Sequence, residues 1–198
     1  KVFARHNIQA MITVKKEMRA ESPDTVIKVV FPRDATATQV YAILNAEIQK
    51  NKQEESNFDD VAKVFNYIPG LLLKFVVWLL NLLDYFGLIP KGLLAVSPFH
   101  GSIYITSMGS LGIPPIFHHL YDFGNVPLFC SFGAKQKRYE LQADGSVAER
   151  KHIDYCFVTD ERICDGFNYA SAFKLTKTFL RNPALLDTPP ETVVEDID

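Results

Sequence analysis

The stretch Val158-Thr159-Asp160-Glu161-Arg162-Ile163-Cys164-Asp165-Gly166-Phe167 decides how the C-terminal part of the chain folds. The β-branched and aromatic run that leads into it, 153–159, predicts a strand, and the apolar pattern that follows, 168–181, predicts a helix. Asp165 stands at an N-cap position, because its carboxylate can accept from the free amides of the first helical turn. We therefore expect a strand, a tight turn and a helix. Rigid elements on both sides would hold the charged side chains at the junction, which suits a chemical site.

The totals of the chain are those of an ordinary globular domain. Its 198 residues are 47% hydrophobic and 22% charged, with a formal net charge of -2. This length supports one domain with a substantial core. The charge balance gives no indication of a nucleic-acid partner or of an anionic membrane surface.

The cysteines indicate a reducing environment. Cys130, Cys156 and Cys164 are an odd number and lack C-x-x-C spacing. We expect neither a disulfide framework nor a zinc site from them. His118 and His119 with Asp122 have no standard metal-ligand spacing either, so we expect no metal. The cytoplasm is the simplest compartment for such a protein.

The N-terminal part predicts a hairpin followed by helices. Residues 7–14 and 25–31 alternate or are β-branched, which predicts two paired strands. Helix-start signals at 34–38 precede apolar residues at helical spacing through Lys52. A second helix is expected at 58–67.

The segment 70–89 is the most apolar of the chain. It is about long enough to cross a bilayer, but Lys74, Asn81 and Asp84 interrupt it. A charge at bilayer depth costs several kcal/mol, so we expect a helix that is buried or faces a neighbouring subunit, and no membrane span.

Four further strands are expected in the second half. They are 101–108, 126–132 and the hairpin of 137–142 with 147–159, whose turn signal is Ala143-Asp144-Gly145-Ser146.

The quoted stretch resembles a known signature. The acyltransferase components of 2-oxo acid dehydrogenase complexes (dihydrolipoamide acyltransferases), and chloramphenicol acetyltransferase with the same fold, carry His-x-x-x-Asp-Gly here. The dehydrogenase components usually have Asp-His-Arg-x-x-Asp-Gly. The present chain has Asp160, Arg162, Asp165 and Gly166 at the matching positions, but Glu161 stands where the family has its catalytic histidine.

The resemblance covers most of the chain. Residues 101–109 are similar to the family strand Gly-x-Phe-x-Ile-Ser-Asn-Leu-Gly, and 126–133 to Val-Ala-Ile-Leu-Gly-x-Gly. The Asp144-Gly145 turn and Asn182-Pro183 after the last helix also match. We expect residues 1–198 to form a single acyltransferase-like catalytic domain. The helix and strand that open the family domain have no counterpart, so its N-terminal part is expected to be missing.

The resemblance implies an α/β (α+β) fold: a mixed β-sheet flanked by helices, chloramphenicol acetyltransferase-like, assembled as a homotrimer. It also implies active-site channels between subunits, with coenzyme A or acyl-CoA as a substrate. One subunit of the family supplies the histidine, and its neighbour supplies the hydroxyl that steadies the oxyanion. A lipoyl domain or a small molecule would serve as acyl partner.

The chemistry at Glu161 has two readings. The ordinary pKa of a thiol is about 8.5 and that of imidazole about 6.5, so a histidine accepts the thiol proton at little cost. The ordinary pKa of a glutamate carboxyl is about 4.3, so transfer of the thiol proton to a carboxylate costs roughly 5–6 kcal/mol. Burial raises the pKa of such a carboxyl and would close part of the gap. Alternatively, Glu161 is a surface or ion-paired residue and the thiol chemistry is lost or greatly slowed.

Other site candidates come from the same resemblance. Thr106 and Ser107, with Ser110 as a weaker candidate, lie where the family places its oxyanion-stabilising hydroxyl, although they could be ordinary strand hydroxyls. His118 or His119 could supply an imidazole in trans as a relocated base, or could simply cap the loop.

The sequence thus predicts a CoA-dependent acyltransferase-type domain that transfers acyl groups between thiols or from acyl-CoA to an acceptor, with an atypical or impaired site. Asp165 would orient that site, and Glu161, Thr106, Ser107, His118 and His119 are its catalytic candidates. The alternative is a non-catalytic trimeric scaffold, or a relative that binds CoA or another ligand.

Overall fold

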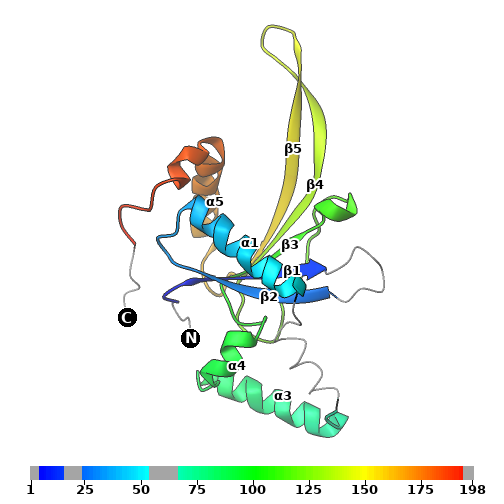
Figure 1. The fold of residues 1–198 in the computed structure, drawn as a ribbon, viewed down its shortest axis with the longest axis vertical. Helices are drawn as coiled ribbons and strands as arrows, with labels where there is room; N and C mark the ends of the chain where they lie inside the picture. Colours follow the sequence, from blue (N-terminus) through cyan, green and yellow to red (C-terminus); the bar gives the residue numbers. More distant parts are fainter. Residues whose placement is uncertain (1–4, 16–23, 54–66, 194–198) are drawn as a thin grey trace.

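The computed structural model describes residues 5–15, 24–53 and 67–193, and their strands form one mixed sheet (Figure 1). The sheet has five strands in the order β2-β1-β3-β4-β5. The strands are β1 (Ile8–Lys15), β2 (Asp24–Phe31), β3 (Ile103–Ser107), β4 (Leu128–Leu141) and β5 (Val147–Thr159). The helices are α1 (Ala37–Gln53), α3 (Gly70–Tyr85), α4 (Lys91–Val96) and α5 (Gly166–Arg181), with 3-10 turns η1 (Gly109–Leu111) and η2 (Pro183–Leu186). The predicted mixed sheet flanked by helices is confirmed.

The strand pairing explains how distant segments meet. β1 and β2 form the predicted antiparallel hairpin, with Ile8 opposite Phe31. β3 lies parallel to both β1 and β4, and β5 returns antiparallel to β4. The segments predicted as separate strands at 126–132 and 137–142 belong to one long strand, β4, with a register shift between Phe132 and Lys135. The end of β5 therefore lies beside the beginning of β4.

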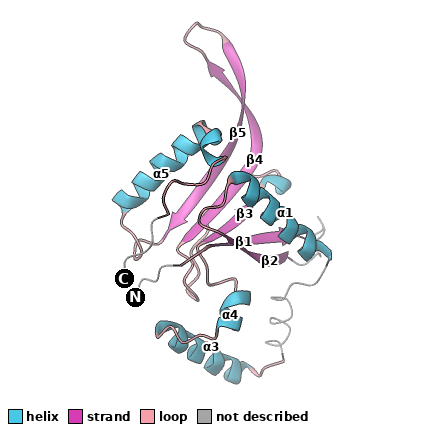
Figure 2. Ribbon diagram, turned by 60° about the vertical axis from the view of Figure 1, so that its left-hand side comes forward, coloured by secondary structure: helices cyan, strands magenta, loops and turns pink. Residues whose placement is uncertain are grey.

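Two apolar clusters lie on the two faces of the sheet. Ala10, Ile27, Val29 and Phe31 are buried against apolar side chains of α1, which include Val40, Ile43 and Leu44. α5 lies on the same side of the sheet as α1 (Figure 2), where the rings of Phe157 and Phe173 are 4.9 Å apart. The opposite face buries Met11, Tyr104, Val126 and Phe129 beneath the loop that carries Leu120 and Tyr121. That loop, 112–127, joins η1 to β4.

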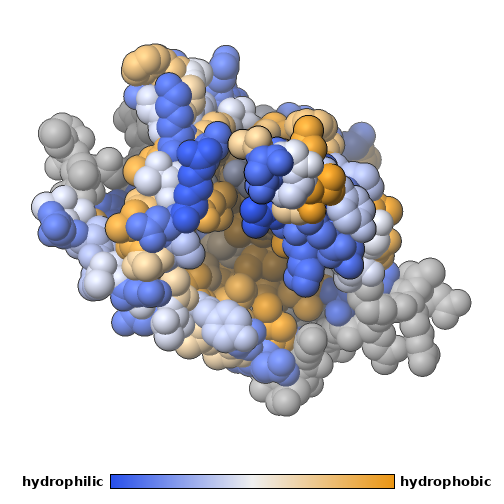
Figure 3. Space-filling view, turned by 90° about the horizontal axis from the view of Figure 1, so that it is seen from above, coloured by the Kyte–Doolittle hydropathy of each residue, from blue (hydrophilic) through white to orange (hydrophobic). Residues whose placement is uncertain are grey.

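The paired strands β4 and β5 extend beyond the rest of the sheet as a two-stranded arm (Figure 1). Tyr139, Leu141 and Val147 on this arm are all exposed. Viewed from above, the molecule is also hollowed at its centre, with hydrophobic surface at the floor and hydrophilic side chains around it (Figure 3). The single chain thus leaves much apolar surface uncovered.

The apolar segment 70–89 differs from the prediction in two ways. The helix α3 ends at Tyr85, because Gly87 takes a positive φ of 69° and Pro90 then precedes the separate short helix α4. None of its residues is buried, and Leu71, Phe75 and Trp78 are more than half exposed. The expectation of a helix buried within its own chain is therefore wrong, whereas a helix that faces a neighbouring subunit stays a prediction.

Within the described ranges, every helix falls short of the length and apolar character that a membrane span requires. The helix predicted at 58–67 lies outside the described residues, except for Tyr67, which is in a turn.

Candidate functional site

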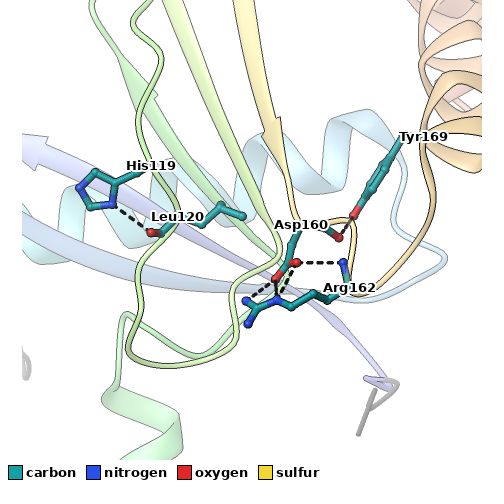
Figure 4. Close-up of polar contacts among 5 residues, drawn as sticks. All are labelled: His119, Leu120, Asp160, Arg162 and Tyr169. Carbon is teal, nitrogen blue, oxygen red and sulfur yellow. Dashed lines mark hydrogen bonds and ion pairs between the residues drawn. The ribbon is translucent and has the colours of Figure 1, made fainter.

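The turn after β5 is held by a network centred on Asp160 (Figure 4). The amide of Asp160 donates to the carbonyl of Pro127 at 2.9 Å, which fixes the turn to the beginning of β4. Its carboxylate accepts from Arg162 Nε at 2.9 Å and from Arg162 Nη2 at 2.6 Å. These hydrogen bonds from Arg162 hold the pKa of Asp160 below its ordinary value. Tyr169 of α5 donates its hydroxyl to the Asp160 carbonyl at 2.9 Å, so strand, turn and helix are locked together.

Asp165 is the N-cap of α5, as the sequence predicts. Its carboxylate accepts from the backbone amide and the side-chain amide of Asn168, both at 2.9 Å. The helix begins at Gly166, directly after the cap. The cap satisfies one of the orphan amides of the first turn and places Gly166 close to the turn residues.

Glu161 is exposed and projects from the middle of this turn. A Cβ built on Gly166 would lie 3.7 Å from Glu161 Oε1, so the carboxylate lies over the first residue of α5. The pKa of Tyr169 is raised, mainly by burial and then by electrostatic interaction with Cys164, Asp160 and Glu161. A carboxylate becomes a stronger base when it is desolvated, whereas Glu161 is exposed to solvent.

The hydroxyl candidates lie toward the other end of the sheet. Thr106 is buried in β3 and pairs with Ser131, whereas Thr159, next to the turn, pairs with Leu128. Ser131 and Leu128 are three positions apart, which corresponds to roughly 10 Å along a strand. Within one chain, the structure therefore does not bring Thr106 together with Glu161.

Ser107 and Ser110 are both exposed. Ser107 Oγ accepts from the amide of Gly109 at 3.4 Å, which is a local contact at the start of η1, and Ser110 lies within η1 itself. Among the described residues, neither hydroxyl has a contact that distinguishes it from an ordinary surface serine.

The paired histidines lie on the loop that covers the opposite face of the sheet. His118 stacks on Phe129 with centroids 4.6 Å apart, and Phe129 pairs with Val158 at the end of β5. The loop thus approaches the Asp160 turn, although Figure 4 shows the ring of His119 directed away from Asp160 and Arg162.

The ring nitrogens of both histidines have defined roles. The Nδ1 atom of His118 contacts the His119 carbonyl at 2.5 Å, and that of His119 contacts the Leu120 carbonyl at 2.9 Å. A carbonyl can only accept, so each Nδ1 carries a proton, and in the neutral form of either ring the lone pair is on Nε2. Such a lone pair is what a general base requires.

One polar cluster in the structure is not indicated by any sequence motif. Ser97, His100 and Asp84 come together beside α3, with Lys28 of β2 next to them. The short spacing from Ser97 to His100 is a local hint of contact, but nothing local indicates Asp84 or Lys28. Among the described residues, no group of three or more histidine, cysteine or acidic side chains could hold a metal ion.

By sequence, the chain matches no protein family and no curated protein. By structure, it is similar to a probable dihydrolipoamide acetyltransferase of Listeria monocytogenes, with a TM-score of 0.56 and 14% identity over 98% of this chain. The chain spans 63% of the length of that protein. At this identity, the likeness shows a common fold.

Two further solved structures align less well. The dihydrolipoamide acetyltransferase of Azotobacter vinelandii has a TM-score of 0.46 at 11% identity, over 92% of this chain and 57% of its own. The cubic core of a pyruvate dehydrogenase multienzyme complex has a TM-score of 0.43 at 12% identity, again over 92% of this chain and 57% of its own.

Proposed function

We propose that the chain is an acyltransferase-type domain that binds CoA or acyl-CoA and whose own transfer chemistry is limited by the glutamate at position 161. The observation that carries the proposal is the turn after β5. Asp160, Arg162 and Asp165 are all engaged in contacts that hold this turn rigid, and the position they hold is occupied by an exposed Glu161. The hydrogen bonds of the turn are intact although Glu161 is a poor base for a thiol proton, which supports the proposal of an altered site on an intact fold.

Assembly belongs to the same proposal. In the single chain Thr106 lies far from Glu161, so a shared site would need the hydroxyl of one copy and the turn of another. The exposed apolar side chains of α3 and of the β4–β5 arm are surfaces that a homotrimer would cover, because soluble monomers rarely leave such patches open. In this proposal, residues 1–198 form one acyltransferase-like domain of each copy.

The proton step limits what the domain can do. Acyl transfer needs the thiol proton removed as the thiol attacks the thioester carbon, and a donor for the oxyanion that forms. An exposed carboxylate is a poor acceptor for that proton. At ordinary pKa values, proton transfer from a thiol to a carboxylate costs roughly 5–6 kcal/mol. Burial of Glu161 by a second copy would reduce this gap.

The test is thioester exchange between acetyl-CoA and a small thiol, measured for the parent chain and two variants. Glu161→His should raise the rate by at least tenfold, because a neutral imidazole accepts the proton at little cost. Glu161→Gln distinguishes the two readings of Glu161. Its rate should fall if the carboxylate is a slow base, and should stay unchanged if Glu161 takes no part.

The control is Glu191→His, which places the same new side chain in the exposed C-terminal segment. Calorimetric titration with CoA is run in parallel. If the protein does not bind millimolar CoA and Glu161→His has no activity, the domain is a scaffold without acyl transfer, which is the alternative function.

His118 and His119 are a second source of a base, favoured by the free lone pairs on their Nε2 atoms. If either acts, the double change His118→Ala with His119→Ala should abolish any exchange activity of the parent chain. An unchanged rate would leave the pair with a loop-capping role only.

A further inference from the structure

A cavity lies between the helices α3 and α4 and the segment that leads into β3. Its volume is about 300 Å³, which is at the lower end of the range for small-molecule sites. The lining side chains are apolar apart from Ser97 and His100. They include Leu73, Val77 and Leu80 of α3, Leu93 and Val96 of α4, and Phe123 of the loop before β4. A largely apolar wall of this size suits a hydrocarbon chain better than a sugar or a nucleotide, whose many polar groups would lose their hydrogen bonds.

One wall of the cavity ends in a buried histidine. The His100 side chain is only 2% exposed, and its Nδ1 lies 2.8 Å from Ser97 Oγ. Ser97 Oγ also accepts from the amide of Phe99, which leaves its own proton to be donated to Nδ1. The proton of the neutral imidazole is thereby assigned to Nε2.

The Nε2–H faces the carboxylate of Asp84, whose Oδ2 is 3.4 Å away, a contact that is long for a hydrogen bond. Among the described residues Nε2 has no hydrogen bond of good geometry. Burial lowers the pKa of His100 against the opposing effect of Asp84, which favours the neutral ring. A buried donor with only one long contact is uncommon, and its position at the cavity wall points to a ligand with an acceptor.

Positive charge is in excess at the same end of the cavity. Lys28 Nζ donates to the carbonyls of Leu94 at 2.6 Å and Ser97 at 3.3 Å, and its third proton has no further hydrogen-bond acceptor among the residues that the structure describes. Arg5, whose Nη2 donates to Asn125 Oδ1 at 2.7 Å, adds a second cation that acts on both Lys28 and His100. The carboxylate that faces these groups within the described ranges is Asp84. Among the described residues, two cations thus face one anion here, and an anionic ligand would balance the charge.

We infer that this cavity binds an aliphatic carboxylate of medium chain length. The hydrocarbon tail lies among the apolar side chains of α3 and α4, and the carboxylate accepts from His100 Nε2 and Lys28 Nζ after a small rotation of the side chains around Ser97. The apolar lining selects the tail, and the excess positive charge selects the sign of the head group. The inference does not rest on the proposed acyl transfer, because it uses neither the Asp160 turn nor the loop histidines.

The first experiment is calorimetric titration of the full chain with octanoate and with octylammonium, which share a tail and differ in the charge of the head. Octanoate should bind at least tenfold more tightly than octylammonium. Lys28→Met, which keeps the length of the side chain and removes its charge, should weaken octanoate binding at least tenfold. Lys177→Met makes the same change at an exposed lysine of α5 and should have no effect.

Two results would overturn the inference: no octanoate binding at millimolar concentration, or equal binding of the two amphiphiles. Because the exposed side of α3 is also apolar, the position of the ligand is checked separately by nuclear Overhauser contacts in the parent chain. Contacts from the octanoate chain to Val77 and Phe123 place it in the cavity, whereas contacts to the highly exposed Leu71 alone would contradict the assignment.

Discussion

At the scale of single residues, Asp165 and Glu161 differ in what they do for the chain. Asp165 makes two hydrogen bonds at the start of α5, so its presence is explained by folding alone. No hydrogen bond of Glu161 is found among the described residues, and its place above Gly166 has no evident structural purpose. The Asp-Gly pair is therefore explained by the fold, whereas Glu161 is the residue of this turn on which the proposed function depends.

The cap can be tested by stability. Asp165→Ala should lower the free energy of unfolding by about 1 kcal/mol, because two donors of Asn168 lose their acceptor. Asp165→Asn keeps an acceptor oxygen and should lose clearly less. Urea unfolding followed by circular dichroism measures both, and equal losses would show that the carboxylate charge, and not the cap geometry, stabilises the helix.

At the scale of elements, local pattern was enough where an element depends on its own sequence. Alternation predicted β1, β-branched and aromatic runs predicted β2 and β5, and helical spacing predicted α1 and α5. The end of α3 was missed because the apolar run continues through Gly87 to Ile89, whereas the chain turns at Gly87. The burial of α3 was mispredicted since an apolar helix indicates that something covers it, but not whether the cover belongs to the same chain.

The same limit applies to the site. The N-cap at Asp165 follows from neighbouring residues, so the sequence predicts it. The separation of Thr106 from Glu161 depends on which strands pair, and the cluster of Lys28, Asp84 and His100 combines three segments far apart in the chain. No periodicity carries that information.

The connection between the loop before β4 and the segment before β3 depends on a glycine. Gly124 has a φ of 88°, and a Cβ there would lie 1.9 Å from the carbonyl oxygen of Phe99. Gly124→Ala should therefore destabilise the fold by about 3 kcal/mol or more, through backbone strain and displacement of Phe99.

Gly92→Ala is the matched control, because its Cβ meets nothing within 4 Å and its backbone is already helical in α4. That change should be neutral or stabilise by up to about 1 kcal/mol. Thermal unfolding of both variants decides the matter, and comparable losses would mean that crowding at Phe99 is not the cause.

At the scale of the whole molecule, the half-buried cation Lys28, at the junction of α4 with the sheet, affects the stability of the fold. Burial, with the repulsion of Arg5, lowers the pKa of Lys28 to about 8 from an ordinary value of 10.5. His100 and Asp84 are the other titratable groups of this cluster. In the folded state Lys28 therefore loses its proton at lower pH than in the unfolded chain.

The lowered pKa of Lys28 makes the free energy of unfolding depend on pH. Between about pH 8 and pH 10 the unfolded chain binds more protons than the folded one, so the free energy of unfolding should rise with pH. Lys28 is only half-buried, and solvent screening limits the rise to about 1 kcal/mol. Lys28→Met should remove this rise in urea titrations at pH 8, 9 and 10. A rise of the same size in the variant would assign it to other groups.

The position of Trp78 has a practical consequence. It is the single tryptophan of the chain and lies on α3, which has no buried residue and stands apart from the sheet (Figure 1). Intrinsic fluorescence will therefore report the surroundings of one peripheral helix, whereas far-ultraviolet ellipticity averages over all strands and helices. A denaturation curve recorded by emission need not coincide with one recorded by ellipticity, and the interval between the two midpoints would measure how cooperatively this helix is coupled to the β-sheet.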